Sequence, residues 1–66
     1  MDIIVNGERQ VVKTATNVQQ LLDIIGVEAI RVVVELNRDI LPRNGFTETS
    51  LKDGDLLEVI QFVGGG

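Results

Sequence analysis

The sequence predicts an α+β fold in which one main helix packs across a small mixed sheet of four to five strands. The chain has 66 residues, enough for one small domain, and 44% of them are apolar, as in globular proteins. Several short runs are rich in β-branched residues, which favour strands. Only one segment has the spacing of apolar residues that is typical of a helix.

The first segment predicts a β-hairpin. Residues 3–5 are apolar and β-branched, and they lead into Asn6-Gly7, a dipeptide in which both residues tolerate positive φ. Residues 10–13 then return as the second strand. The side chains that we expect to point inward are Ile3, Val5 and Val12.

The segment from Asn17 to Gly26 predicts the helix. Asn17 is a good N-cap, and Gln20, three residues later, is placed to complete a capping box. Gly26 follows the last apolar residue, where a left-handed C-terminal cap is expected. The apolar stripe consists of Val18, Leu21, Leu22 and Ile25.

Three later segments complete the predicted sheet. Residues 30–36 have strong β propensity, residues 40–41 suit a very short strand that Pro42 stops, and residues 56–63 form the last strand. Residues 43–55 are predicted to be irregular, with a turn at Asp53-Gly54-Asp55. The core residues expected from these segments are Val32, Val34, Leu36, Phe46 and Leu51.

This element order favours the β-grasp, or ubiquitin-like, fold. If the first and last strands lie side by side in the middle of the sheet, they run parallel and the connection between them carries the helix. We predict that residues 1–63 form the β-grasp domain. Residues 64–66 are three glycines, which we predict to form a flexible C-terminal tail.

Composition argues against several classes of function. The chain has no cysteine and no histidine. It therefore lacks a thiol nucleophile, the usual metal-binding side chain and an evident base that could activate the Ser50 hydroxyl as a nucleophile. Asp53 and Asp55 flank a glycine as in a turn, and no calcium-loop spacing follows them. We therefore predict that the chain is not an enzyme and binds no metal.

The net charge and the pattern of apolar residues limit the classes of partner and the location that we expect. The net charge is −4, basic residues are scattered, and Trp and Tyr are absent, which disfavours nucleic acid as a partner. No run approaches the roughly 20 apolar residues of a membrane span, and the start lacks a basic segment followed by an apolar one. The expected location is the cytoplasm.

The last strand has two apolar faces. Leu57 and Val59 share one face, whereas Ile60 and Phe62 share the other. If the helix covers only the first face, Ile60 and Phe62 are exposed next to the tail and form a partner-binding surface. In the alternative, Phe62 folds back over the edge of the sheet.

Four stretches of the chain together resemble the ThiS family of sulfur carrier proteins in thiamine biosynthesis. They are IIVNGE, VQQLL, VVVELNRDILPR and, most specifically, the closing LKDGDLLEVIQFVGGG, and they cover nearly the whole chain. Relatives often have a glycine in the turn at Asn37-Arg38, and this chain does not. Arg43 matches a family position, and we interpret it as a solvated surface charge.

The resemblance implies a reaction sequence centred on the C-terminal carboxylate of Gly66. A ThiF-like adenylating enzyme joins this carboxylate to AMP, using ATP and magnesium, and sulfur from a donor such as a cysteine desulfurase then replaces AMP. The resulting thiocarboxylate gives its sulfur to thiazole synthase, a ThiG-like enzyme. Gly64 and Gly65 serve as the arm, and the carrier binds no cofactor itself and is a monomer when free.

Physical chemistry is consistent with this role for the tail. A free α-carboxylate is an anion at neutral pH and attacks phosphorus, but it is a poor electrophile until it is activated. Three extended residues span at most about 10 Å, which carries the carboxylate beyond the globular body. Without side chains, the backbone fits a narrow active site.

Four alternatives remain at this point. Small subunits of molybdopterin synthase share the fold and the terminal Gly-Gly, and a ubiquitin-like modifier would use the same activation to form amides with lysines. A plain β-grasp binding module would dock on a partner without using the tail. The glycines alone are also compatible with a frayed end or a cloning remnant.

Overall fold

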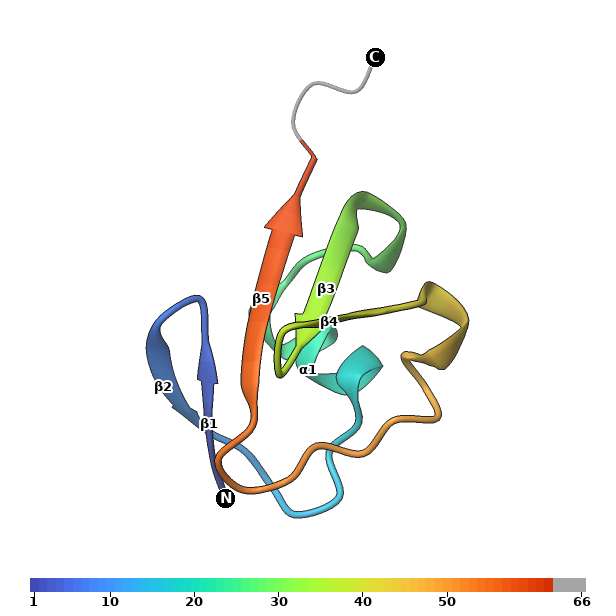
Figure 1. Ribbon diagram of the computed structural model, residues 1–66. Helices are drawn as coiled ribbons and strands as arrows, with labels where there is room; N and C mark the ends of the chain where they lie inside the picture. Colours follow the sequence, from blue (N-terminus) through green and yellow to red (C-terminus); the bar gives the residue numbers. More distant parts are fainter. Residues whose placement is uncertain (63–66) are drawn as a thin grey trace.

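The computed structural model describes residues 1–62 and confirms the predicted α+β architecture. One helix packs across a mixed five-stranded sheet whose strand order is β2-β1-β5-β3-β4 (Figure 1). The elements are β1 (Asp2–Val5), β2 (Glu8–Val11), α1 (Val18–Ile25), the 3-10 helix η1 (Ala29–Arg31), β3 (Val32–Leu36), β4 (Asp39–Leu41), the 3-10 helix η2 (Arg43–Gly45) and β5 (Leu56–Gln61).

The first and last strands lie side by side in the middle of the sheet. β1 and β5 are parallel, with Ile4 opposite Leu56 and Val5 opposite Leu57, whereas β3 and β5 are antiparallel. The connection between the parallel strands contains α1. This arrangement is the β-grasp fold, and it makes β5 the central strand.

The helix begins and ends at the predicted residues. The Asn17 side chain accepts a hydrogen bond from the Gln20 backbone N–H at 2.7 Å, and Gln20 Oε1 accepts one from the Asn17 N–H at 2.9 Å. Gly26 has φ +83 and closes the helix in the left-handed conformation. Because an eight-residue helix is marginal alone, its stability comes from packing on the sheet.

The core lies between α1 and the sheet. Every residue predicted to point inward is buried, except that Ile25 and Leu36 are half-buried and pack against the rest. Phe46 and Leu51 anchor the long segment between β4 and β5, as predicted. The buried hydrophobic residues are Ile3, Val5, Val12, Val18, Leu21, Leu22, Val32, Val34, Phe46, Leu51 and Leu57.

The main differences from the predicted strand ends are found in β2, β3 and β5. β2 begins at Glu8, earlier than predicted, because the two-residue turn at Asn6-Gly7 lets pairing resume at once. β3 begins at Val32, and Ile30 lies in η1 with 69% of its surface exposed. β5 ends at Gln61, and residues 63–66, which include the predicted tail, lie outside the described residues.

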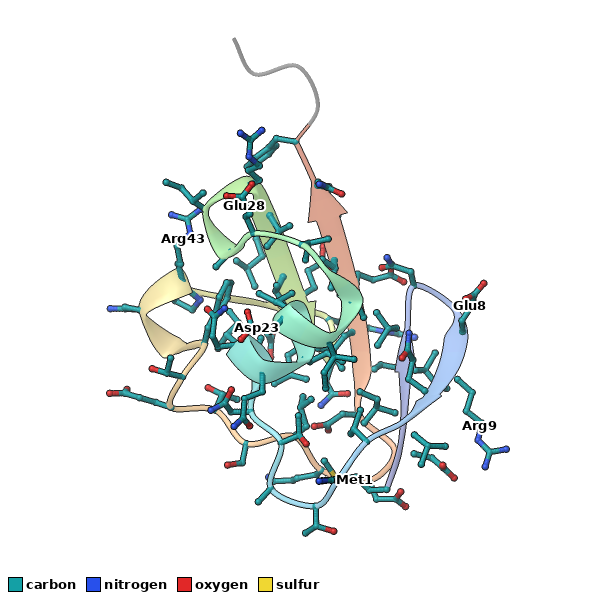
Figure 2. The ribbon with its side chains drawn as sticks, turned by 180° about the vertical axis from the view of Figure 1, so that it is seen from behind. Met1, Glu8, Arg9, Asp23, Glu28 and Arg43 are labelled. Carbon is teal, nitrogen blue, oxygen red and sulfur yellow. The ribbon has the colours of Figure 1, made fainter. Side chains whose placement is uncertain are left out.

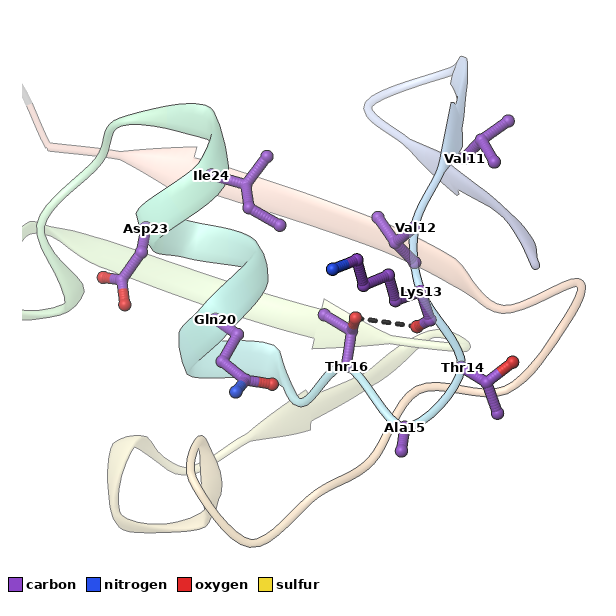
Figure 3. Close-up of a pocket in the computed structure, with 9 residues that line it drawn as sticks. All are labelled: Val11, Val12, Lys13, Thr14, Ala15, Thr16, Gln20, Asp23 and Ile24. Carbon is purple, nitrogen blue, oxygen red and sulfur yellow. Dashed lines mark hydrogen bonds between the residues drawn. The ribbon is translucent and has the colours of Figure 1, made fainter.

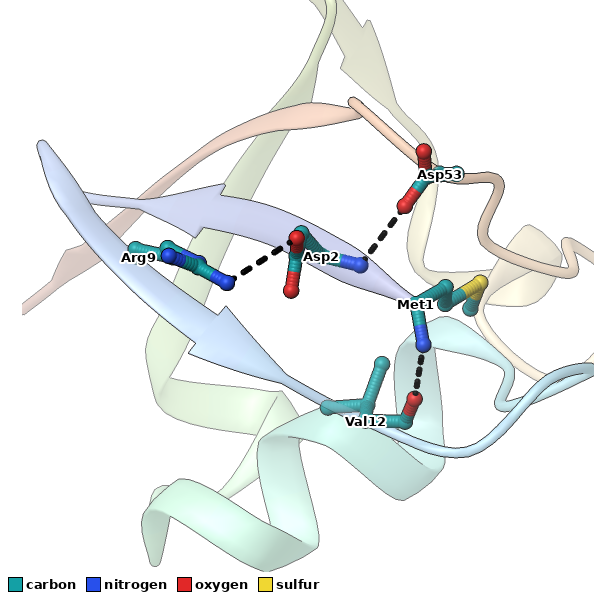
Figure 4. A network of polar contacts seen from close by, with 5 residues as sticks. All are labelled: Met1, Asp2, Arg9, Val12 and Asp53. Carbon is teal, nitrogen blue, oxygen red and sulfur yellow. Dashed lines mark hydrogen bonds and ion pairs between the residues drawn. The ribbon is translucent and has the colours of Figure 1, made fainter.

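The start of β1 is fixed by polar contacts with two other segments (Figure 4). The Met1 ammonium donates to the Val12 carbonyl at 2.8 Å, and the Asp2 N–H donates to the Asp53 carboxylate at 2.7 Å. Arg9 pairs with the Asp2 carboxylate at 3.2 Å, but both side chains are exposed and the pair contributes little. Asp53 therefore has a structural role, in agreement with its interpretation as a turn residue.

Candidate functional site

The candidate site is the end of β5, because that strand leads directly to the C-terminal glycines. β5 extends beyond the tip of the β1–β2 hairpin (Figure 1), and its pairing with β1 involves Leu56 and Leu57. Gly64, Gly65 and Gly66 lie outside the described residues, so their role stays a prediction. The structure describes the strand that precedes them in the sequence.

Alternate side chains of β5 point to opposite faces of the sheet, as predicted. Leu57 is fully buried beneath α1, whereas Ile60 and Phe62 are 49% and 54% exposed on the other face. The Phe62 N–H donates to the Arg31 carbonyl at 2.8 Å, which continues the β3–β5 pairing by one step. Phe62 is therefore not folded into a buried position at the edge, and the partner-binding role of Ile60 and Phe62 stays a prediction.

These two residues belong to a larger apolar surface that the helix leaves uncovered. The strand register places Val33 opposite Ile60, Ile4 opposite Leu56, and Ile40 opposite Glu35. We call this surface the outer face of the sheet. On β1, β3, β4 and β5 and at Phe62 it includes Ile4, Val33, Glu35, Ile40, Leu56, Glu58, Ile60 and Phe62. Arg9 of β2, which lies opposite Ile4, belongs to the same face.

Asn6 holds β5 beyond the point where β1 ends. Its side-chain Oδ1 accepts from the Val59 N–H at 2.8 Å, and its Nδ2 donates to the Val59 carbonyl at 3.3 Å. Asn6 itself has φ +51, in the left-handed region that asparagine tolerates well. The residue thus makes the hairpin turn and also replaces one missing step of the β1–β5 ladder.

Asn37 holds the beginning of β5 from the other side. Its backbone N–H donates to the Leu56 carbonyl at 2.7 Å, and its side-chain oxygen accepts from the Leu56 N–H at 3.0 Å. Its Nδ2 donates to the buried Asp55 carboxylate at 3.0 Å, and this carboxylate also accepts from the Lys52 N–H at 2.7 Å. These contacts give Asp55 a structural role.

Sequence reasoning missed both asparagine contacts. It interpreted Asn6 and Asn37 through their tolerance of turn conformations, which is a local property. Their partners lie 53 and 19 residues away in the chain, so no local pattern indicates them. The available signal was the residue type, because an asparagine amide has a donor and an acceptor that match one peptide unit.

Arg43 has contacts that the sequence did not predict. The side chain is exposed, as expected of a surface charge, but Nε donates to the Ala29 carbonyl at 3.0 Å and Nη2 to the Ile30 carbonyl at 3.3 Å. Figure 2 shows Arg43 near the segment that follows Glu28. Because the next residue in that segment, Arg31, accepts from Phe62, Arg43 supports the backbone beside the end of β5.

A shallow groove of about 560 Å³ lies elsewhere, between α1 and residues 11–16 (Figure 3). It opens on the helix side of the molecule, away from the outer face. Of the nine residues that line it, Lys13 and Asp23 are charged, and they provide no nucleophile with an adjacent base. We assign no catalytic role to this groove.

The described part of the chain has neither a cluster of metal-binding side chains nor a helix long enough to span a membrane. Within residues 1–62, histidine, cysteine and acidic side chains nowhere gather in a group of three that would hold a metal ion. The single α-helix of this part, with eight residues, is too short to cross a membrane.

Comparison with known proteins identifies the family. Residues 2–66 match the model of the ThiS family, so the match includes β5 and the three glycines that follow it. The chain belongs to the ThiS family. The molybdopterin-synthase alternative gains no support from this match.

Similar proteins agree with this ThiS assignment. The crystal structure of the thiamine biosynthesis protein ThiS from Geobacter metallireducens is 40% identical, with a TM-score of 0.84 over 100% of both chains. The sulfur carrier protein ThiS of Bacillus subtilis (strain 168) is 37% identical over 54 residues, 82% of each protein. A thiazole synthase of Paramagnetospirillum magneticum is 36% identical over the whole chain, which spans only 20% of that protein's length.

Proposed function

We propose that this sulfur carrier of thiamine biosynthesis holds its sulfur as a thiocarboxylate on the C-terminal Gly66. Gly64 and Gly65 form the arm that carries the carboxylate into partner active sites. The observation that supports this most directly is the family match through residue 66, in a chain whose central strand leads straight to the glycines. A side-chain-free end leaves the acyl carbon open to attack.

In this proposal the chain is a substrate and not an enzyme. The Gly66 carboxylate attacks the α-phosphorus of ATP, forms an acyl adenylate and releases pyrophosphate. The terminal sulfur of a persulfide then displaces AMP to form an acyl disulfide, and a thiol attacks the donor's sulfur in that disulfide, so that the S–S bond breaks, a new disulfide forms and the thiocarboxylate leaves. The chain has no cysteine or histidine to supply these steps, so a ThiF-like adenylating enzyme provides ATP and magnesium, and a donor such as a cysteine desulfurase provides sulfur. Because the adenylating enzyme uses ATP, we expect the carrier to act in the cytoplasm.

Thiazole synthase is the proposed acceptor of the sulfur. Support comes from the thiazole synthases of Paramagnetospirillum magneticum and Magnetococcus marinus, each of which contains a region similar to this whole chain within about a fifth (20%) of its length. A carrier-like region and a synthase in one polypeptide are expected to act in the same pathway. We expect the free carrier to be a monomer that binds neither nucleic acid nor membrane.

The thiocarboxylate is tested by mass spectrometry. We expect incubation with the adenylating enzyme, ATP and a sulfur donor to replace one oxygen by one sulfur at the terminus. A chain that lacks Gly65 and Gly66 should keep its circular dichroism spectrum and remain unmodified. An unchanged mass of the intact chain, under conditions that modify the Bacillus subtilis carrier, would contradict the proposal.

The docking role of the exposed end of β5 is tested separately. Ile60→Asp and Phe62→Asp place a charge at half-exposed positions, so we expect weaker binding to the partner enzymes and an intact fold. Ile24→Asp is the matched control, since Ile24 is 61% exposed on α1, on the opposite side of the sheet. Unfolding of the Ile60 and Phe62 variants would show that these positions are part of the core.

A further inference from the structure

Three consecutive carbonyl groups of η1 link Arg43 to the end of β5. The Arg43 Nε donates to the Ala29 carbonyl at 3.0 Å, and Nη2 donates to the Ile30 carbonyl at 3.3 Å. The next carbonyl along the chain, that of Arg31, accepts from the Phe62 N–H at 2.8 Å. Arg43 therefore holds the same short stretch of backbone that holds Phe62, the last residue that the structure describes.

Few other contacts fix η1. It has three residues, none of which is fully buried, and of these Ala29 packs against the core. The Arg31 side chain pairs with Glu28 at 3.1 Å, but both side chains are exposed and such pairs contribute little. The Arg31 carbonyl thus lies between the buried Val32 of β3 and a segment whose charge-assisted hydrogen bonds come from Arg43.

Arg43 itself lies on a firmly anchored segment. It begins η2, and the N–H of Phe46, the residue that follows this element, donates to the Arg43 carbonyl at 3.1 Å. Phe46 is 2% exposed, and its carbonyl accepts from the Gln19 N–H of α1 at 3.0 Å. The core therefore fixes η2, and the Arg43 side chain extends this support to η1 and the end of β5.

We propose that Arg43 is a positioning residue for adenylation, because it fixes the point at which the C-terminal arm leaves the domain. This inference rests on the proposed function, in which the Gly66 carboxylate must reach the α-phosphorus of ATP bound to a partner. Gly66 is four residues beyond Phe62, so an arm anchored there spans at most roughly 14 Å. When Phe62 loses its bond to Arg31, the free arm is longer and delivers the carboxylate to the reaction less often.

A docking role for the Arg43 charge predicts a different pattern. A cation that only attracts an acidic surface of the partner is replaceable by any other cation. Hydrogen bonds to two consecutive carbonyls, in contrast, need the forked guanidinium of arginine, since the lysine ammonium is a point charge on a flexible stem. Arg43→Lys therefore keeps the attraction and loses the positioning, whereas Arg43→Gln loses both.

The first test is amide hydrogen exchange of the full chain in solution, measured by NMR without any partner. In Arg43→Lys and Arg43→Gln, we expect the Phe62 N–H to exchange at least about threefold faster, because its hydrogen bond to Arg31 opens more often. The amides of α1 should keep their wild-type exchange rates, since the Arg43 side chain is exposed and lies outside the core.

The second test is the rate of adenylate formation by a ThiF-like enzyme in single turnover, at saturating ATP and varied carrier concentration. If Gln61 and Phe62 both come free, the arm grows from four residues to six, and its effective concentration falls about twofold, as the −3/2 power of its length. We therefore expect the maximal rate to fall about two- to threefold in both Arg43 variants, with the half-saturating carrier concentration unchanged.

Arg38→Gln is the matched control, because it removes one arginine charge at the β3–β4 turn, beside the start of β5, and should change neither measurement. Unchanged exchange of Phe62 would overturn the inference, as would faster exchange throughout the chain, an equal effect of the control, a wild-type adenylation rate in Arg43→Gln, or a rate restored by Arg43→Lys. No adenylate from the unaltered chain would contradict the proposed function and this inference with it, whereas the exchange measurement tests only the link from Arg43 to Phe62.

Discussion

Substitution of Asn6 tests how firmly β5 is held beyond the end of β1. Asn6→Gly keeps a backbone that suits φ +51 but removes the two side-chain hydrogen bonds to Val59. A neutral hydrogen bond contributes roughly 0.5–1.5 kcal/mol net, and these two are exposed to water that partly replaces them. We therefore expect the free energy of unfolding to fall by about 1–2 kcal/mol.

Two further substitutions of Asn6 separate the contributions of its two side-chain hydrogen bonds and of its left-handed backbone conformation to the free energy of unfolding. Asn6→Asp keeps the acceptor for the Val59 N–H and loses only the donor, so about 1 kcal/mol should be lost. Asn6→Ala loses both bonds and also places an ordinary side chain in the left-handed region, so about 2–3 kcal/mol should be lost. The expected order of stability is wild type, Asp, Gly, Ala.

Urea unfolding followed by far-ultraviolet circular dichroism provides the measurement, because the chain has no Trp or Tyr for fluorescence. A loss of 1 kcal/mol corresponds to about 4–8 °C in melting temperature for a domain of this size. If Asn6→Gly is as stable as the wild type, the two amide bonds contribute nothing. Asn6 would then not extend the β1–β5 ladder in any way that stabilises the protein.

Three other substitutions follow from the backbone and the core. Arg38 has φ +74 at a turn where glycine carries no strain, so Arg38→Gly should raise the stability by roughly 0.5–1 kcal/mol in a urea titration. Gly26→Ala should cost about 1 kcal/mol in the same assay, because φ is +83 while the space around the added methyl group is free. Leu22 is fully buried, so Leu22→Ala should cost about 2–5 kcal/mol by thermal unfolding, whereas Ile24→Ala, at a 61% exposed neighbour, should stay within about 0.5 kcal/mol.

The features that the sequence predicted correctly depend on residues close together in the chain. The capping box joins Asn17 to Gln20, and the helix stripe repeats every three to four residues, so both can be identified from short windows. Alternation along β5 likewise separates Leu57 from Ile60, and the structure confirms that one is buried and the other exposed. The parallel pairing of the first and last strands, β1 and β5, was predicted from the order of the elements along the chain.

The features that the sequence did not predict depend on how distant segments meet. Arg43 contacts Ala29 and Ile30 only because η1 and η2 come together in the folded chain. Ile30 has the β propensity of its neighbours, but a strand forms only where another strand pairs with it, and pairing of β3 begins at Val32. The position of Glu35 opposite Glu58 likewise depends on the register of β3 and β5, which residue propensities do not determine.

The position of β5 between a parallel and an antiparallel neighbour has a mechanical consequence. A partner that draws on the chain at Phe62 pulls along the strand axis, while the hydrogen bonds to β1 and β3 run across it. The pull therefore loads all of these hydrogen bonds in shear at the same time, and they do not break one after another. The amides of Asn6 and Asn37 add to the same shared resistance, so traction during insertion of the terminus should leave the body intact.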